Sequence, residues 1–142
     1  MIRLGSLAGY AFEGPRVLAG WTAPKTPAVY VIMYRPDESK QNNLAVLYVG
    51  HSDDLSAEGF PFKNLRSACW IKRAGSKFNV HIATLEIPGG TRAHREQVVG
   101  ELCAVYDPAC NTEKFDNAWQ PHWIQDYDTP NTTGPLTTPR EA

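Results

Sequence analysis

The sequence predicts an α+β fold: a small domain in which a three-stranded, mainly antiparallel sheet is flanked by helices. Residues 28–34 and 44–50 are runs of β-branched and aromatic residues, and both are almost continuously apolar, as is typical of strands covered on both faces. Residues 78–83 alternate apolar and polar side chains, which indicates a third strand. Apolar residues at helical spacing occur before and after this third strand, so we expect a helix on each side of it in the chain.

The first two strands are expected to form a hairpin. The link between them, residues 35–43, is polar and contains turn-forming residues such as Pro36. A hairpin centred near residue 39 places Tyr30 and Tyr48 directly opposite each other on one face of the sheet. A slip of one residue would destroy this arrangement, because it would move one of the two side chains to the other face.

Two helices are expected after the hairpin. The first is basic, begins near Lys63 and ends at Gly75, a residue type that commonly terminates helices. The second begins near Thr91 and ends before Pro108. The apolar positions of the second helix follow the i, i+3, i+4, i+7 template and are Val98, Val99, Leu102 and Val105.

Composition divides the chain into four parts. Residues 1–26, in which apolar residues are scattered among Gly and Pro, are expected to be an N-terminal extension packed on the domain. The domain itself is expected over residues 27–112. A Trp-rich segment over residues 113–127 is expected to pack on the domain, and residues 128–142, where apolar residues nearly vanish, to form a disordered tail.

Length and composition indicate one soluble domain. The chain has 142 residues, and no apolar stretch approaches the roughly 20 residues that a membrane helix needs. The N-terminal residues lack the continuous apolar core of a signal peptide, so we expect a cytoplasmic protein without a membrane partner. Three cysteines are too few and too oddly numbered for a disulfide framework and are expected to be reduced core thiols, without zinc. They are Cys69, Cys103 and Cys110.

Charge is distributed unevenly along the chain, although the net charge is only −1. Residues 63–95 carry seven basic and one acidic side chain, whereas residues 96–142 carry two basic and eight acidic ones. The basic middle can present a phosphate-binding surface, or the acidic end can cover it and neutralise it. Sequence leaves these two interpretations open.

Three short motifs occur along the chain, and their order is informative. Residues 28–30 read Ala-Val-Tyr, residues 48–50 read Tyr-Val-Gly, and an amphipathic helix is followed by Pro-x-x-Asn at residues 108–111. Over residues 27–112 this order resembles the GIY-YIG nuclease family. The resemblance implies that Gly50 and Asn111 support an active site.

The resemblance also implies a catalytic mechanism. One tyrosine of the pair Tyr30 and Tyr48 would assist deprotonation of the attacking water, an arginine would steady the phosphate, and a glutamate would hold one Mg²⁺ ion. Glu58 stands where the family has its arginine, and Val99 where it has its glutamate. The possible substitutes are Arg66 or Lys63 for the phosphate contact, and Glu96, three residues before Val99, as metal ligand.

We therefore expect a GIY-YIG-like nucleic-acid-associated domain, with impaired or absent phosphodiester hydrolysis, that acts as a binding module, for DNA rather than RNA. The alternative is an active Mg²⁺-dependent endonuclease with Tyr30, Tyr48, Arg66 and Glu96 as its catalytic residues. The candidate nucleic-acid contacts are His51, Lys63, Arg66, Lys72, Arg73 and Lys77.

Simpler interpretations exist for the same residues. The two tyrosines can be ordinary strand aromatics, Asn111 a turn cap, and the basic residues the solvated face of a helix. A different function is also possible, namely a structural or protein-interaction domain. Residues 115–127 are expected to form a short helix that docks the indoles of Trp119 and Trp123, four residues apart, on the core. Exposure of the two indoles would instead favour a contact surface for a protein partner.

Overall fold

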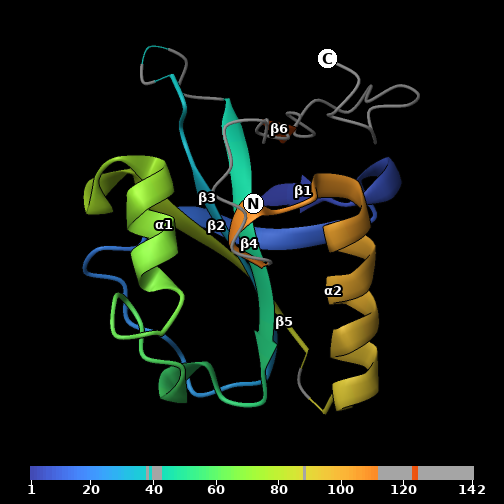
Figure 1. Cartoon of the computed structure of the whole chain (residues 1–142). Coiled ribbons are helices and arrows are strands. Elements are labelled where there is room, and N and C mark those ends of the chain that lie inside the picture. The colour runs from blue at the N-terminus through green and yellow to red at the C-terminus, as the bar shows by residue number, and fades with distance from the viewer. Residues whose placement is uncertain (38, 40–42, 88, 112–122, 125–142) are drawn as a thin grey trace.

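The described residues form a six-stranded antiparallel sheet with one α-helix on each face, as a computed structural model shows (Figure 1). The structure describes residues 1–37, 39, 43–87, 89–111 and 123–124. The predicted α+β class is confirmed. The sheet is larger than the predicted three strands, with the order β1-β2-β5-β3-β4-β6.

Helices and strands follow one another in a simple order. The strands are β1 (Ile2–Leu4), β2 (Tyr10–Val17), β3 (Ala28–Tyr34), β4 (Leu44–Ser52), β5 (Val80–Glu86) and β6 (Trp123–Ile124). The α-helices are α1 (Ser67–Ala74) and α2 (Arg92–Tyr106). Four 3₁₀ turns accompany them: η1 (Ser6–Ala8), η2 (Leu55–Ala57), η3 (Lys77–Asn79) and η4 (Ala109–Asn111).

Strand β3 lies at the centre of the sheet, because it pairs with β4 on one side and β5 on the other. All of its residues are buried, as its continuous apolar sequence predicts for a strand covered on both faces. The additional strands β1, β2 and β6 come from residues that lie outside the predicted three-stranded core. The segment 1–26 thus contributes two strands to the same sheet as the rest of the domain.

The two helices cover opposite faces of the sheet, and Figure 1 shows α1 and α2 on either side of the strands. Alternate residues of β3 point to opposite faces, so Val29 and Val31 pack under α2 whereas Tyr30 and Ile32 pack under α1. We call these the α2 face and the α1 face of the sheet. The predicted helical positions Val98, Leu102 and Val105 are buried in the core of the α2 face.

Helix ends follow the expected signals. The hydroxyl of Thr91 accepts a hydrogen bond from the backbone N–H of His94 and so caps α2. Helix α1 ends at Gly75, which adopts a left-handed conformation with φ of 83°, but it begins at Ser67, later than the predicted Lys63. Among the described residues, no helix is both long and apolar enough to cross a lipid bilayer.

The prediction of reduced cysteines is wrong for two of the three. Cys69 of α1 and Cys110 of η4 form a disulfide, with Cα atoms 5.8 Å apart, and Cys103 is free. The two partners are 41 residues apart in the chain and meet only because α1 and η4 pack on the same core. Disulfides are more common in oxidising compartments, and the cytoplasmic location stays a prediction.

The Trp-rich segment is described at two residues only. Trp123 and Ile124 form β6, whose pairing with Leu44 and Ala45 extends the sheet, so the predicted helix over residues 115–127 is wrong at these two positions. The rest of that helix, including Trp119, and the predicted disordered tail lie outside the described residues.

Candidate functional site

The two motif tyrosines are neighbours on the α1 face. Their ring centroids are 5.9 Å apart. The prediction that they pair directly is wrong, because Tyr30 pairs with Gly50 and Tyr48 pairs with Ile32. A register shift between Ile32 and Met33 contributes to this difference, since Met33 pairs with Val46. At the tyrosines the partner differs from the predicted one by two positions, which keeps both side chains on the same face.

The glycine of the Tyr-Val-Gly motif makes room for this contact. A Cβ atom built on Gly50 would lie 2.7 Å from the Cζ and Oη atoms of Tyr30 and 2.7 Å from Cε2 of Tyr48. No side chain fits there without displacing an aromatic ring. Gly50 therefore permits the close approach of the two tyrosines to the backbone of β4.

Other aromatic residues enclose the pair. The ring of Phe60 lies 5.0 Å from that of Tyr30 in an edge-to-face contact, and Trp70 of α1 lies 5.7 Å from Tyr48. Trp21 contacts the far side of this cluster, 5.5 Å from Phe60. As a result, Tyr30 is only 2% exposed, whereas Tyr48 is half-buried and is the more accessible of the two.

Arg66 is the basic residue that the fold brings to the tyrosines. Its guanidinium carbon lies 5.7 Å from the ring centroid of Tyr48, within the range of a cation–π contact. Its Nη1 atom also donates a hydrogen bond of 2.9 Å to the carbonyl oxygen of Cys110. Arg66 just precedes α1, so the helix and the η4 turn together fix its position.

The tyrosine environment disfavours a phenolate at Tyr30. Burial raises the pKa of Tyr30, and the neighbouring Tyr48 and the carboxylate of Glu58 raise it further, against the opposing effect of Arg66. A phenol with a raised pKa stays protonated and donates a hydrogen bond, but it does not readily accept a proton at neutral pH.

Glu58 is the carboxylate near the tyrosine pair, and sequence reasoning assigned it no role. It caps the end of η2, and one of its carboxylate oxygens accepts a hydrogen bond of 2.9 Å from the hydroxyl of Ser52. The signal that could have located it is the turn directly after β4, where Asp54 accepts a hydrogen bond from the backbone of Ser56. This turn returns the chain toward the end of the hairpin.

Glu96 lies elsewhere. It belongs to α2, on the opposite face of the sheet from Tyr30 and Tyr48, and its exposed carboxylate forms an ion pair of 2.9 Å with Arg92, one turn away. The structure therefore does not bring this predicted metal ligand onto the face that carries the tyrosines. In the described part of the chain, no group of three or more His, Cys, Asp and Glu side chains could hold a metal ion.

Comparison with protein-family models, with curated proteins and with solved structures found no match. The resemblance to GIY-YIG nucleases thus rests on the order of the sequence motifs alone.

Asn111 is hydrogen-bonded to the strand that carries the Tyr-Val-Gly motif. Its side-chain amide accepts a hydrogen bond from the N–H of Val49 and donates one to the carbonyl oxygen of the same residue, both at 2.8 Å. Among the described residues, β6 pairs with β4 at Leu44 and Ala45, and Asn111 contacts β4 further along the same strand, at Val49. The amide takes the place of a neighbouring strand.

His51 faces the other side of the sheet. Its Nδ1 atom accepts a hydrogen bond of 3.4 Å from Nε of Arg95, which is buried on α2. Burial and the positive charge of Arg95 lower the pKa of His51. A pocket of about 150 Å³ at this end of the sheet is lined by His51, Ser52, Asp53, Glu58, Arg92 and Arg95.

The remaining basic candidates lie in and around α1. Over residues 63–77 the chain has five basic and no acidic side chains. Lys63, Lys72 and Lys77 are exposed, whereas Arg66 and Arg73 are half-buried. We call these five residues the basic α1 segment. His51 is not part of it, since it contacts α2 on the opposite face.

Proposed function

We propose that this domain is a GIY-YIG-like nucleic-acid-binding module with impaired or absent phosphodiester hydrolysis. The observation that carries the proposal is the separation of Tyr30 and Glu96, which lie on opposite faces of the sheet. In-line hydrolysis needs the nucleophile, the metal and the phosphate in one place, and a misplacement of only about 1 Å can cost roughly 10²-fold in rate.

The burial of Tyr30 supports the same proposal. The ring of Phe60 packs against the ring of Tyr30, and the pKa of Tyr30 is raised, so the hydroxyl group of Tyr30 does not readily accept a proton from water. Glu58 stands where the family has its phosphate-binding arginine, and its negative charge would repel a phosphate rather than hold it.

The basic α1 segment supports a binding role. Next to it, Phe78 is 68% exposed, and Nζ of Lys77 lies 5.5 Å from its ring centroid. Exposed aromatic rings among basic side chains suit an unpaired nucleic-acid strand, because bases stack on the ring while the cations approach the phosphates. DNA is the partner that we propose, as the resemblance implies.

Binding is tested by titrating a labelled single-stranded and a labelled double-stranded DNA, and the corresponding RNAs, at several salt concentrations. The variant Lys72→Ala with Arg73→Ala should weaken binding and reduce the salt slope by about one to two. The matched control is Arg3→Ala, which removes an exposed arginine from β1 at the far edge of the sheet. A DNA affinity that changes neither with the salt concentration nor in the double variant would contradict the proposal.

One specific observation favours an active nuclease as a second candidate. Arg66 lies over Tyr48, and the charge of Glu58 acts on Tyr30, so a cation and a carboxylate do accompany the tyrosines. Mg²⁺ is the cofactor that such a site would need, with Glu58 rather than Glu96 as the carboxylate on the tyrosine side.

The two candidates are separated by a cleavage assay with Mg²⁺ or Mn²⁺ against EDTA. The binding module predicts no cutting at high protein concentration. Metal-dependent cutting that is lost in Tyr48→Phe and Glu58→Gln, but kept in Glu96→Gln, would establish the nuclease. Loss of cutting in the Glu96→Gln variant would instead identify Glu96 as the metal ligand, as expected from the sequence.

A further inference from the structure

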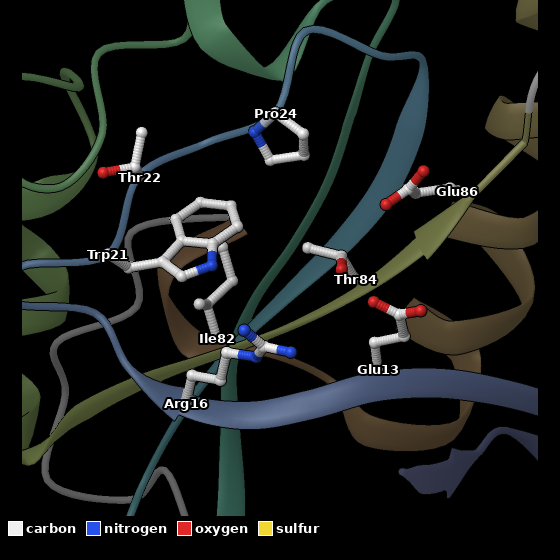
Figure 2. A pocket seen from close by; sticks show the side chains of 8 residues that line it. All are labelled: Glu13, Arg16, Trp21, Thr22, Pro24, Ile82, Thr84 and Glu86. Atoms are coloured by element: carbon white, nitrogen blue, oxygen red, sulfur yellow. The ribbon is translucent and has the colours of Figure 1, made fainter.

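A pocket of about 230 Å³ lies beside the tyrosine pair, between β2, β5 and the loop that follows β2 (Figure 2). Its floor is formed by Ile82 and Thr84, which alternate with residues pointing to the α2 face. Ile82 belongs to the same core as Tyr30, so the pocket opens on the α1 face. Its volume is below the roughly 300–1,000 Å³ of pockets that enclose a drug-sized ligand, which suits a single ring system.

Strand pairing places this pocket close to Tyr30. Thr84 of β5 pairs with Tyr30 of β3 on one side and with Glu13 of β2 on the other. The three residues form one row across the sheet, so the backbone positions of Glu13 and Tyr30 are only about 10 Å apart, two strand spacings. Trp21 separates the pocket from the tyrosines and contacts Phe60, which in turn contacts Tyr30.

Acidic and basic side chains line this pocket together with the indole ring of Trp21. Figure 2 shows Trp21 on the left, the carboxyl groups of Glu13 and Glu86 on the right, and Arg16 below Trp21. Glu13, Glu86 and Arg16 are exposed. Within the described part of the chain, these three side chains form no hydrogen bond or ion pair with one another or with other residues.

We propose that this pocket binds one unpaired guanine base of a single-stranded nucleic acid. The inference deepens the proposed function and rests on it. A carboxylate only accepts hydrogen bonds, and guanine presents two adjacent N–H donors, N1 and N2, on its Watson–Crick edge. A guanidinium only donates, and guanine offers O6 and N7 as acceptors. The indole of Trp21 supplies the aromatic surface on which an unpaired base stacks.

The combination of two carboxylates, a guanidinium and an indole in one pocket favours guanine over simpler ligands. A small cation would be attracted by the two carboxylates but repelled by Arg16, and a free phosphate would meet the opposite arrangement. Adenine has one amino group where guanine has two adjacent donors, so it cannot satisfy a carboxylate in the same way. A flat, neutral ring with donors on one edge and acceptors on another uses all the groups that the pocket offers.

The test is calorimetric titration of the whole protein with three twelve-nucleotide single strands: all thymidine, thymidine with one central guanosine, and thymidine with one central adenosine. We expect the guanosine strand to bind at least tenfold more tightly than the other two. Guanosine monophosphate serves as a second probe of the pocket alone. Glu13→Gln and Glu86→Gln should each remove the preference for guanosine, while Trp21→Phe should weaken binding of both purine strands.

Glu101→Gln is the matched control, because it alters an exposed carboxylate on α2 that hydrogen-bonds with Tyr10, away from the pocket. Strands that bind equally well, or a guanosine preference that survives Glu13→Gln and Glu86→Gln, overturn the pocket while the proposed function stands. Guanosine monophosphate binding that needs Glu13, without binding of any strand, upholds the pocket and overturns the proposed function. Binding of neither probe overturns both.

Discussion

The side chain of Asn111 completes the strand that carries the Tyr-Val-Gly motif, since its amide forms two hydrogen bonds of 2.8 Å with the main chain of Val49. The contact joins residues 62 positions apart in the chain. It holds β4 at Val49, between Tyr48 and Gly50, beyond the described pairing of β4 with β6 at Leu44 and Ala45. The position of Tyr48 therefore depends on a side chain outside the sheet.

Replacing Asn111 with alanine should destabilise the fold by about 1–3 kcal/mol, because the N–H and the carbonyl group of the buried Val49 lose their partner. Urea unfolding measures the change. Asn111→Asp in its ionised form keeps an acceptor for the N–H of Val49 but loses the donor to the carbonyl oxygen of Val49, so it should also destabilise the fold. Equal stability of the alanine variant and the parent would show that the edge of β4 does not need this contact.

Replacing Gly50 with alanine should also destabilise the fold, by about 1–3 kcal/mol, because the new methyl group would overlap the rings of Tyr30 and Tyr48. The matched control is Gly100→Ala. Gly100 lies in α2, where an added Cβ meets nothing within 4 Å, so alanine there should stabilise the helix by up to about 1 kcal/mol. The two glycine substitutions are thus expected to change the unfolding midpoint in opposite directions.

The disulfide between Cys69 and Cys110 should stabilise the fold by about 2–4 kcal/mol, because it restricts the unfolded chain. Cys69→Ala with Cys110→Ala should lower the unfolding midpoint accordingly, while Cys103→Ala should have a smaller effect. Denatured protein should react with one equivalent of a thiol reagent before reduction and with three after it, from the three cysteines in the chain. Three equivalents before reduction would contradict the bond.

Stability should fall as the pH is lowered through the titration range of His81. This residue is 3% exposed, and burial together with Arg35 lowers its pKa to about 4. Its Nε2 atom lies 3.0 Å from Nη1 of Arg35, so the ring is held in the neutral, accepting form. Below a pH of about 6.5 the unfolded chain binds a proton that the folded protein does not, hence the fold loses up to about 3 kcal/mol between pH 6.5 and 4.

Urea unfolding at intervals between pH 4 and pH 7.5 measures this loss, with His81→Gln as the comparison. The variant should be less dependent on pH over that range, although His51, whose pKa is also lowered, leaves some dependence of the same sign. An unchanged slope in the variant would assign the effect to other groups. Stability that rises on acidification would reverse the expected sign.

Much of the tyrosine site follows from local patterns in the sequence. The continuous apolar runs around Tyr30 and Tyr48 predict two buried strands. The period of two in a strand places both side chains on one face even though their pairing partners differ from the predicted ones by two positions. Gly75 and Thr91 likewise mark helix ends through local backbone and capping preferences.

The N-terminal strands show what local patterns miss. Strand β2 contains Gly14 and Pro15, residue types that normally interrupt strands. The strand accommodates them because a register shift between Glu13 and Arg16 removes the need for regular pairing with β5 at these two positions. Pairing with a distant strand therefore outweighs the local preference. Without β2 there is no pocket beside Tyr30, so the pocket could not be predicted either.

The sequence by itself determined the α+β class, the central apolar strands and the shared face of Tyr30 and Tyr48, because these depend on the periods of strands and helices. Only the tertiary structure decided which charged residues lie near the two tyrosines. A turn brings Arg66 onto Tyr48, another brings the charge of Glu58 close enough to raise the pKa of Tyr30, and α2 carries Glu96 on the other face. The physical reason is that periodicity fixes the direction of a side chain within its own element, whereas its neighbours depend on how distant elements pack.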